Sequence, residues 1–313
     1  MNAIVINGYG GPEKLEWGEF PDPHPSPDEI LVRVKAASVN PVDWKIRQGR
    51  LKFITGRKFP LFLGTEVAGF VEEVGSEVKG FKPGDRVFAG MSYKGGGYAE
   101  KAVTRGDRAI LIPPEIGFNE ACTFAVAGIT PLQAFRKHTG VKQGTRVLVN
   151  GASGGVGTYA VQIAKLLGGT VTGVCSEKNM ELVKGLGADE VIDYGKEDFR
   201  DREDAWDIIL DAASNAVFKE VRSSLRKNGV LIKLNYSVRT ILTGAWTRLF
   251  SDKKVKMIVL NNEPADLEWI RDHVASGAMH VVVDRTFPLE DAAEAHRYSE
   301  TGRAVGKIVL VVD

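Results

Sequence analysis

The sequence predicts an α/β protein in which an irregular, β-rich part is joined to a doubly wound parallel sheet. Two observations lead to this prediction. Short apolar or alternating runs, separated by proline and glycine, fill the first third of the chain. From about Asn119 onward, solid Val/Ile/Leu runs alternate with helical patterns. Strands that are apolar throughout are typical of a parallel sheet covered by helices on both faces.

The β-rich part is expected to contain five short strands, with PDPHPSPD and FKPGD as breaks between them. These strands are expected at residues 3–6, 29–36, 67–74, 86–89 and 109–112. A helix follows, because apolar residues recur at helical spacing after an N-cap expected at Asn119. Gly140 is the expected end of this helix.

In the parallel part, over the middle of the chain, expected strands alternate with expected helices. Its expected strands are 146–150, 170–175, 190–192, 206–211, 230–234 and 257–260, and its expected helices are 155–167, 179–186 and 215–225. The tail is expected to hold helices at 265–275 and 290–299 and strands at 281–283 and 308–312. The last strand is apolar and needs a partner sheet, so we expect the tail to return to the first domain. The predicted domains are therefore 1–120 with 262–313, and 121–261.

Composition excludes several classes of protein. The 313 residues carry Lys+Arg 41 against Asp+Glu 40, a net charge of +1, with no basic run, so the chain as a whole offers no field for nucleic acid or an anionic membrane. No apolar stretch is long enough to span a bilayer, and the first residues do not resemble a secretory signal. Cys122 and Cys175 are isolated, which favours a reducing compartment; we expect a cytoplasmic protein.

The run VLVNGASGGVG is the most informative stretch of the chain. A buried strand leads into a GxxGxxG turn, formed by Gly151, Gly154 and Gly157, and a helix follows. Such glycines allow a tight turn, close approach to a pyrophosphate and close packing of helix on strand. The residues between them are Ser153, Gly155 and Val156. A sharp turn alone can require glycine, but the repeated strands and helices around it favour dinucleotide binding.

The end of the next strand leaves the choice of nicotinamide cofactor open. Glu177 would accept the ribose 2′-hydroxyl of NAD, whereas Ser176 with Lys178 would hold the 2′-phosphate of NADP. Glu177 and Lys178 also fit an exposed first helical turn with no ligand role. Of the two cofactors we favour NADPH.

Several motifs resemble one family in their order along the whole chain. They are GASGGVGTYAVQIAK, SVNPVDWKIRQG, FPLFLGTEVAGFVEEVG, FKPGDRVF, GGGYAEKAV, AGITPLQAF, LGADEVIDY and VGKIVL. The first closely resembles the quinone oxidoreductase signature of the medium-chain dehydrogenase/reductase superfamily. Together they look most like its zinc-free branch, which contains zeta-crystallin-type quinone reductases and alkenal/enone reductases.

This resemblance implies a GroES-like catalytic domain split around a Rossmann domain, NADPH as cofactor, a homodimer, and a cleft between the domains for nicotinamide and substrate. The strand at 257–260 would form the dimer contact at the sheet edge. Carried onto this sequence, it places Ser153 and Val156 along the pyrophosphate. It places Ser176, Lys178 and Tyr194 beside the 2′-phosphate, although Tyr194 also fits ordinary packing at a strand end. Thr130 and Asn40 would lie at the nicotinamide end of the cofactor.

The resemblance also argues against a metal. At the positions where zinc-dependent members hold their catalytic ion, this chain has Asn40, Thr65 and Glu66, of which only Glu66 is a good zinc ligand. The five histidines are scattered, and we expect them in solvated or helix-surface positions. We therefore expect no metal site.

Without a metal, the substrate must accept hydride readily, which favours a quinone or an α,β-unsaturated ketone or aldehyde. Asn40 and Lys45 are the candidate polar groups near the substrate carbonyl, although Lys45 also fits a solvated loop. Asp43 is expected to pair with Lys45 or to cap a turn. Tyr98 is a weaker candidate for a polar group near the substrate and is expected to pack under the cleft, and Cys122 is expected to be a buried core thiol.

Two alternatives remain: a zinc-free reductase of another carbonyl, or a dinucleotide-binding protein without catalysis. Loops at 52–60 and 236–250 are expected to line the substrate pocket. The second of these loops also fits a dimer contact.

Overall fold

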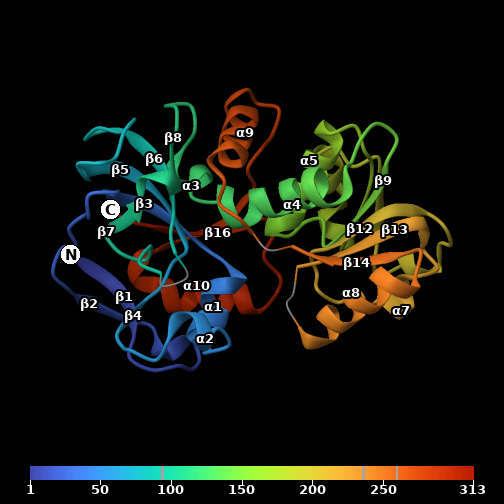
Figure 1. The fold of residues 1–313 in the computed structure, drawn as a ribbon, viewed down its shortest axis with the longest axis horizontal. Helices are drawn as coiled ribbons and strands as arrows, with labels where there is room; N and C mark the ends of the chain where they lie inside the picture. Colours follow the sequence, from blue (N-terminus) through green and yellow to red (C-terminus); the bar gives the residue numbers. More distant parts are fainter. Residues whose placement is uncertain (93–94, 235–236, 259) are drawn as a thin grey trace. The chain divides into compact units, whose positions relative to one another are not determined.

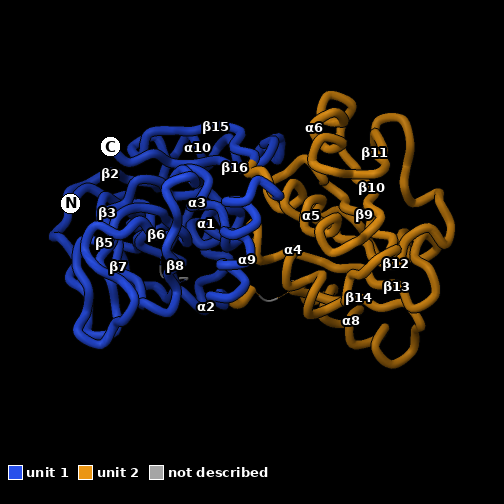
Figure 2. Tube along the Cα trace, turned by 90° about the horizontal axis from the view of Figure 1, so that it is seen from above, with its two compact units in different colours: residues 1–126, 262–278, 282–313 blue, residues 127–261, 279–281 orange. Residues whose placement is uncertain are grey.

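The chain forms two compact units, which Figure 2 colours separately. The computed structural model describes residues 1–92, 95–234, 237–258 and 260–313. Unit 1 contains Met1–Val126, Asn262–Ala278 and Val282–Asp313, and unit 2 contains Ala127–Asn261 and Met279–Val281. We retain the predicted domain boundaries, 1–120 with 262–313 and 121–261, as a proposal.

Unit 1 is built on a seven-stranded sheet in the order β15-β16-β3-β5-β6-β8, with β7 also paired to β3. Its strands are β3 (Glu29–Val39), β5 (Glu66–Val74), β6 (Arg86–Gly90), β7 (Lys101–Arg105), β8 (Ala109–Leu111), β15 (Val283–Pro288) and β16 (Lys307–Val311). β16 pairs antiparallel with β3, so the end of the chain returns to the first sheet, as its apolar sequence predicts. A three-stranded sheet joins β2 (Glu16–Glu19), β1 (Asn2–Ile6) and β4 (Leu61–Phe62).

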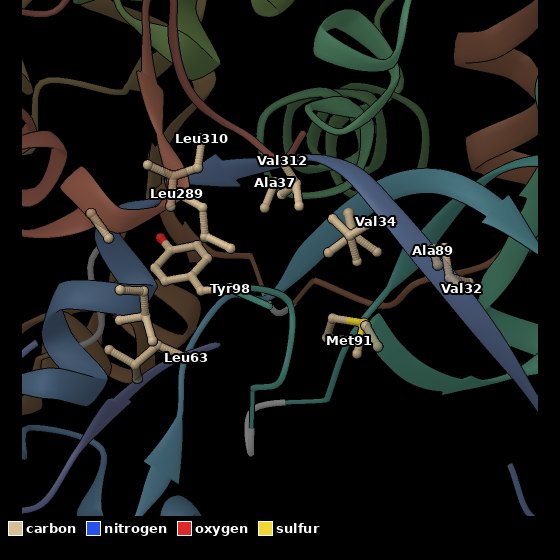
Figure 3. Close-up of a cluster of buried hydrophobic side chains, with 14 of the residues drawn as sticks. Val32, Val34, Ala37, Leu63, Ala89, Met91, Tyr98, Leu289, Leu310 and Val312 are labelled. Atoms are coloured by element: carbon tan, nitrogen blue, oxygen red, sulfur yellow. The ribbon is translucent and has the colours of Figure 1, made fainter. Parts of the chain in front are cut away.

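The helices of unit 1 cover these sheets. They are α1 (Pro41–Arg47), α2 (Lys52–Thr55), α3 (Phe118–Ala121), α9 (Pro264–Ala275) and α10 (Ala292–Glu300), with 3-10 turns at Pro12–Lys14, Gly106–Arg108 and Leu289–Asp291. Figure 3 shows the core, in which Tyr98 lies beside Leu63 and Leu289 and none of the three side chains is more than 4% exposed. This core therefore combines buried apolar side chains from both ends of the chain.

Unit 2 contains a six-stranded sheet in the order β11-β10-β9-β12-β13-β14, and every neighbouring pair is parallel. The strands are β9 (Arg146–Asn150), β10 (Thr170–Cys175), β11 (Glu190–Asp193), β12 (Trp206–Asp211), β13 (Leu225–Lys233) and β14 (Lys254–Met257). Counted along the chain this is the order 3-2-1-4-5-6 of a doubly wound dinucleotide-binding sheet, which confirms the predicted fold class. Figure 1 shows α5 (Gly155–Leu166) beside these strands.

The remaining helices of unit 2 are shorter than expected in several places. They are α4 (Thr130–Gln133), α6 (Met180–Gly185), α7 (Phe218–Val221) and α8 (Val238–Phe250), with a π-helical segment at Ala134–Thr139 and 3-10 turns at Glu177–Asn179 and Phe199–Asp201. Another π-helical segment, Phe124–Ile129, begins in unit 1 and ends in unit 2. Gly140 ends the long helical region at φ +68°, as predicted. The predicted N-cap Asn119 is wrong, because Gly117 caps α3 and its N–H donates to Glu120.

Three strand and helix boundaries also differ from the prediction. The helix expected at 215–225 is limited to α7, because Leu225 is fully buried against β12 and already belongs to β13. β14 begins at Lys254, within the charged stretch that precedes the predicted strand 257–260, since its lysine Nζ atoms donate to backbone carbonyls such as that of His138. The strand expected at 281–283 lies later, as β15, because His280 instead bonds through its backbone to Gln162.

The segment 236–250, expected to be a loop, is mostly the helix α8. Ser237 caps it by accepting a hydrogen bond from the Thr240 N–H at 3.1 Å. Tyr236, the first residue of the predicted loop, lies outside the described residues, as does residue 259 of the predicted strand 257–260.

Candidate active site

The glycine turn of unit 2 follows directly from β9. Gly151 has φ +83°, and a Cβ there would lie 3.0 Å from the Ala213 nitrogen. A Cβ at Gly157 would lie 2.0 Å from the Gly151 carbonyl oxygen, which is far inside van der Waals contact. The folding of this turn therefore requires glycine at both positions.

Gly154 is different, because the fold alone does not require glycine there. Its backbone is extended, and a Cβ would lie 3.5 Å from its nearest neighbour, an ordinary contact. It forms the N-cap of α5 and, being glycine, has no side chain that could accept from the first N–H groups of that helix. The missing side chain leaves the helix N-terminus accessible to an anion, which fits the pyrophosphate of a dinucleotide.

The residues predicted to surround the pyrophosphate lie together at this turn. Ser153, Gly155 and Val156 are half-buried between β9 and the first turn of α5. The Asn179 Nδ2 donates to Ser153 Oγ at 3.0 Å and so joins the turn to the end of β10. Thr130 is buried on α4, which packs against α5 in the same unit.

The predicted 2′-phosphate residues follow the ends of β10 and β11. The Tyr194 N–H donates to the Cys175 carbonyl at 3.1 Å, which holds Tyr194 next to Ser176. The Tyr194 side chain is 67% exposed, so it is not packed as an ordinary strand-end residue. Lys178 is exposed and forms no ion pair within the described parts of the chain.

Sequence reasoning missed Lys196, which changes the charge at this edge. Its Nζ donates to Glu177 Oε1 at 2.5 Å and lies 3.9 Å from Asp193. Both partners are acids at the ends of β10 and β11, so Lys196 compensates their negative charge. The one feature of the sequence that could have indicated Lys196 is its position two residues after Tyr194, in the run VIDYGK.

A second polar cluster is fully buried in unit 1, around Asn40. The Asn40 Nδ2 donates to Ser38 Oγ at 2.9 Å and to Glu66 Oε1 at 2.8 Å. Its Oδ1 accepts a hydrogen bond from Lys307 Nζ at 2.5 Å, and Lys307 lies 3.5 Å from Glu66. The Asn40 amide therefore has both of its hydrogens engaged within the protein.

Glu66 is similarly occupied. Ser38 Oγ and Asn40 donate to its Oε1, and the Val126 N–H donates to its Oε2 at 2.9 Å. With the nearby Lys307 ammonium, both carboxylate oxygens have partners, which satisfies a charge that is 0% exposed. Lys307 was not predicted, although it lies in the closing motif VGKIVL.

A chain of hydrogen bonds runs from α10 to α1 beside this cluster. Arg47 can only donate, so its 3.2 Å contact makes His296 Nδ1 an acceptor and leaves the ring hydrogen on Nε2. His296 Nε2 then donates to the Tyr98 hydroxyl at 3.2 Å, and that hydroxyl donates to Asp43 Oδ2 at 3.2 Å. The Asn40 N–H also donates to Asp43 Oδ2, at 2.8 Å, so Asp43 caps α1, one of the two roles expected for it.

Burial determines the protonation states of the residues that these hydrogen bonds link. It raises the pKa of Asp43 to about 7, with the Glu66 charge adding to the effect. It lowers the pKa of His296 to about 3, and the adjacent Arg47 guanidinium acts in the same direction. His296 is thus a neutral, 0% exposed residue, which corrects the prediction that all five histidines are solvated or on helix surfaces.

The other predicted polar residue, Lys45, lies on α1 and is half-buried. Its Nζ lies 5.4 Å from the centroid of the Trp44 ring. Burial lowers the pKa of its ammonium group, and the neighbouring Arg50 charge adds to this. Such a lysine is a ready hydrogen-bond and proton donor.

Thr65, another residue at the predicted site, has a buried Oγ1 that makes no hydrogen bond of ordinary geometry to a described residue.

The described parts of the chain contain no group of three His, Cys, Asp or Glu residues placed to hold a metal ion. Nor do they contain a helix that is long and apolar enough to cross a membrane. Cys122 is buried, and burial raises the pKa of its thiol well above the ordinary value, so it is a core residue rather than a nucleophile.

Comparisons with known proteins agree with this architecture. Residues 26–114 match the alcohol dehydrogenase GroES-like domain, and residues 186–310 match the zinc-binding dehydrogenase domain. The chain is 39% identical to a chloroplast envelope quinone oxidoreductase homolog from Arabidopsis thaliana, over 99% of this chain and 98% of that protein. It is 34% identical to an NADPH-dependent alkenal/one oxidoreductase from the same plant, over 99% of this chain and 79% of that protein.

A solved structure gives the same result at the level of the fold. The Escherichia coli quinone oxidoreductase complexed with NADPH superposes with a TM-score of 0.88, at 28% identity, over 100% of both chains. The sheet order and the glycine turn define a dinucleotide-binding domain, and the relatives place it in a nicotinamide-dependent oxidoreductase. Within that class, the chain belongs to the medium-chain dehydrogenase/reductase superfamily, and its relatives are quinone oxidoreductases and alkenal/one reductases.

Proposed function

We propose that the protein reduces a quinone or an α,β-unsaturated ketone or aldehyde with NADPH, and that no metal takes part. The observation that carries the proposal is the glycine turn, in which Gly154 has room for a Cβ and yet leaves the N-terminus of α5 open. The names of the relatives support the two substrate classes.

The preference for NADPH is supported by the charges at the ends of β10 and β11. Glu177, which would recognise an unphosphorylated ribose, is paired with Lys196. Lys178 is exposed, and Ser176 and Tyr194 lie beside it to donate hydrogen bonds to phosphate oxygens. A 2′-phosphate would therefore meet two lysines rather than a free carboxylate.

A bound nicotinamide cofactor would supply hydride to an electron-poor carbon of the substrate. Lys45 donates a hydrogen bond to the substrate carbonyl, where negative charge develops. Asn40 is a positioning residue, because its amide is fully engaged with Ser38, Glu66 and Lys307. It holds the N-terminus of α1, the helix that carries Lys45.

The absence of a metal is supported by the donors at the positions that bind zinc in related enzymes. Asn40 and Thr65 are poor zinc ligands, and the carboxylate of Glu66 has protein partners at both oxygens. A catalytic zinc needs three converging protein ligands and an open position. The side chains at these positions do not provide such a zinc site.

We also propose a homodimer in a reducing compartment such as the cytoplasm. β14 is an edge strand, paired only with β13 among the described residues, which supports pairing across a two-fold axis. Two buried free cysteines support the compartment. Sedimentation velocity and cell fractionation test these two points separately.

The test of the function is the loss of reduced-nicotinamide absorbance with one quinone and one enone, using NADPH or NADH, with and without a chelator. We expect turnover with NADPH that the chelator does not change. Lys178→Ala should raise the KM for NADPH and leave the KM for NADH nearly constant. Turnover abolished by chelator would contradict the metal-free proposal. NADPH binding without turnover of any acceptor would indicate a non-catalytic binding protein.

A further inference from the structure

The helix α8 of unit 2 exposes its apolar side chains to solvent. Trp246 is 48% exposed, Leu249 74% and Phe250 71%. Val238, Ile241 and Leu242 are exposed as well and recur at helical spacing. They form one stripe along the helix, which we call the α8 stripe: Val238, Ile241, Leu242, Trp246, Leu249 and Phe250.

The opposite face of α8 packs on the protein, and it is made of small and hydroxyl residues. Thr247 is 0% exposed, and its Oγ1 accepts the Val255 N–H of β14 at 3.1 Å. A Cβ at Gly244 would lie 3.3 Å from the Val255 carbonyl, so the helix lies close against β14 (Figure 1). Ordinary surface helices bury their apolar face, and α8 does the reverse. This arrangement indicates a partner for the α8 stripe.

The charges on α8 have one sign. Residues 237–251 contain Arg239 and Arg248 and no aspartate or glutamate. Both arginines are exposed, and neither forms an ion pair with a described residue. At 3.6 residues per turn, Arg248 lies at one edge of the α8 stripe and Arg239 lies near the other edge, on the side of Trp246 and Phe250. The chain as a whole is nearly neutral, so this local excess of positive charge could not be read from its composition.

We propose that the α8 stripe binds the surface of an anionic lipid bilayer, with α8 lying in the plane of the interface. An apolar face with Trp, Phe and Leu, flanked by arginines, is the pattern of an interfacial helix. Tryptophan favours the headgroup region, and each arginine near an anionic surface adds attraction. The helix lies on the bilayer and does not cross it.

A second copy of the chain fits this surface less well. Pairing two α8 stripes would bring arginines near arginines, and no acid in residues 237–251 could compensate them. A small-molecule substrate also fits poorly, because thirteen helical residues extend about 20 Å. A lipid surface satisfies both the length and the charge.

The test is flotation of the full chain with vesicles of phosphatidylcholine and phosphatidylglycerol, compared with pure phosphatidylcholine. We expect binding to the anionic vesicles that weakens at high salt. Arg239→Gln/Arg248→Gln should reduce binding about 30-fold, for two arginines near an anionic surface. The variant Trp246→Ser/Leu249→Ser/Phe250→Ser should not float.

Two matched variants control for changes in exposed surface and net charge. Trp17→Ser/Phe53→Ser/Leu111→Ser alters the same residue types at other exposed positions, and Arg222→Gln/Arg303→Gln removes the same charge elsewhere. Both should float like the unaltered protein. Equal flotation of the α8 and control variants would overturn the proposal. Failure of the unaltered protein to float would also overturn the proposal. If, in addition, the triple α8 variant sediments as a monomer where the unaltered protein is a dimer, the α8 stripe binds a second copy of the chain instead.

Discussion

Asp43 is a carboxyl group held in the interior by two donors, the Asn40 N–H and the Tyr98 hydroxyl. Its buried Oδ1 makes no hydrogen bond of ordinary geometry to a described residue, and the Thr65 hydroxyl and the Lys307 charge offset its desolvation only in part. Burial therefore raises the pKa of Asp43 from 3.8 to about 7. In this pH interval the folded chain keeps a proton that the unfolded chain releases.

Asp43 should thus make stability fall as pH rises from 3.8 to about 7, because the unfolded state binds fewer protons there. Asp43→Asn removes this contribution. Urea unfolding at pH 4, 5.5 and 7.5 should give a less negative slope of unfolding free energy against pH than in the unaltered protein. Asp252→Asn, at an exposed position, is the control. An unchanged slope in Asp43→Asn would show that Asp43 titrates normally.

Gly154 and Gly157 make a matched pair, since only one of them is required by the fold. Gly154→Ala adds a Cβ at an ordinary 3.5 Å contact, so the melting temperature should be nearly unchanged while NADPH binding weakens at least tenfold. Gly157→Ala places a Cβ 2.0 Å from a carbonyl oxygen and should cost about 1–3 kcal/mol of stability. Thermal melts and cofactor titration separate the two. Undiminished NADPH binding by Gly154→Ala would argue against a pyrophosphate at this turn.

The residues that sequence reasoning found and missed differ in how local their signal is. The glycine turn could be predicted because its requirements arise within a few residues of chain. The pairing of Lys196 with Glu177 joins the ends of two strands, and His296 meets Arg47 across 249 positions of sequence. No local pattern encodes such meetings, so Lys196 and His296 were missed.

At the level of elements, the same distinction explains the strands. The bounds of β9, β10 and β12 match the prediction, because strands buried on both faces are continuous apolar runs. β14 lies at the sheet edge, where Lys254 and Lys256 can extend to carbonyls, and its charged sequence concealed it. α8 was predicted as a loop because its apolar stripe does not face a core.

β16 begins at Lys307, whose ammonium group contacts Asn40 and Glu66. Lys307→Met leaves the buried Glu66 charge without its cation and should cost about 3–5 kcal/mol. Lys307→Met/Glu66→Gln should recover a large part of this loss, because the uncompensated charge is then removed. Urea denaturation of the two variants measures both effects. If the double variant is less stable than Lys307→Met alone, the ion pair is not the cause.

At the scale of the whole molecule, residues 1–126 and most of the tail after residue 261 build one unit together. Arg47 Nη2 donates to Glu300 at 2.5 Å, and Gln48 Nε2 donates to the same carboxylate at 2.8 Å. The candidate substrate residues on α1 are therefore held by α10 and β16. Unit 2 takes only Met279–Val281 from the tail, where His280 bonds to Gln162.

Deleting residues 282–313 should accordingly abolish turnover and leave NADPH binding intact. The variant loses β15, β16 and α10, which leaves Ala36–Val39 of β3 without their partner strand and α1 without its partner helix, so unit 1 should unfold. Unit 2 keeps all of its segments, and NADPH binding should persist while turnover is lost. Limited proteolysis should degrade residues 1–126 and spare 127–261. Retained turnover would show that the tail is dispensable for the catalytic unit, and loss of NADPH binding would show that unit 2 cannot fold without unit 1.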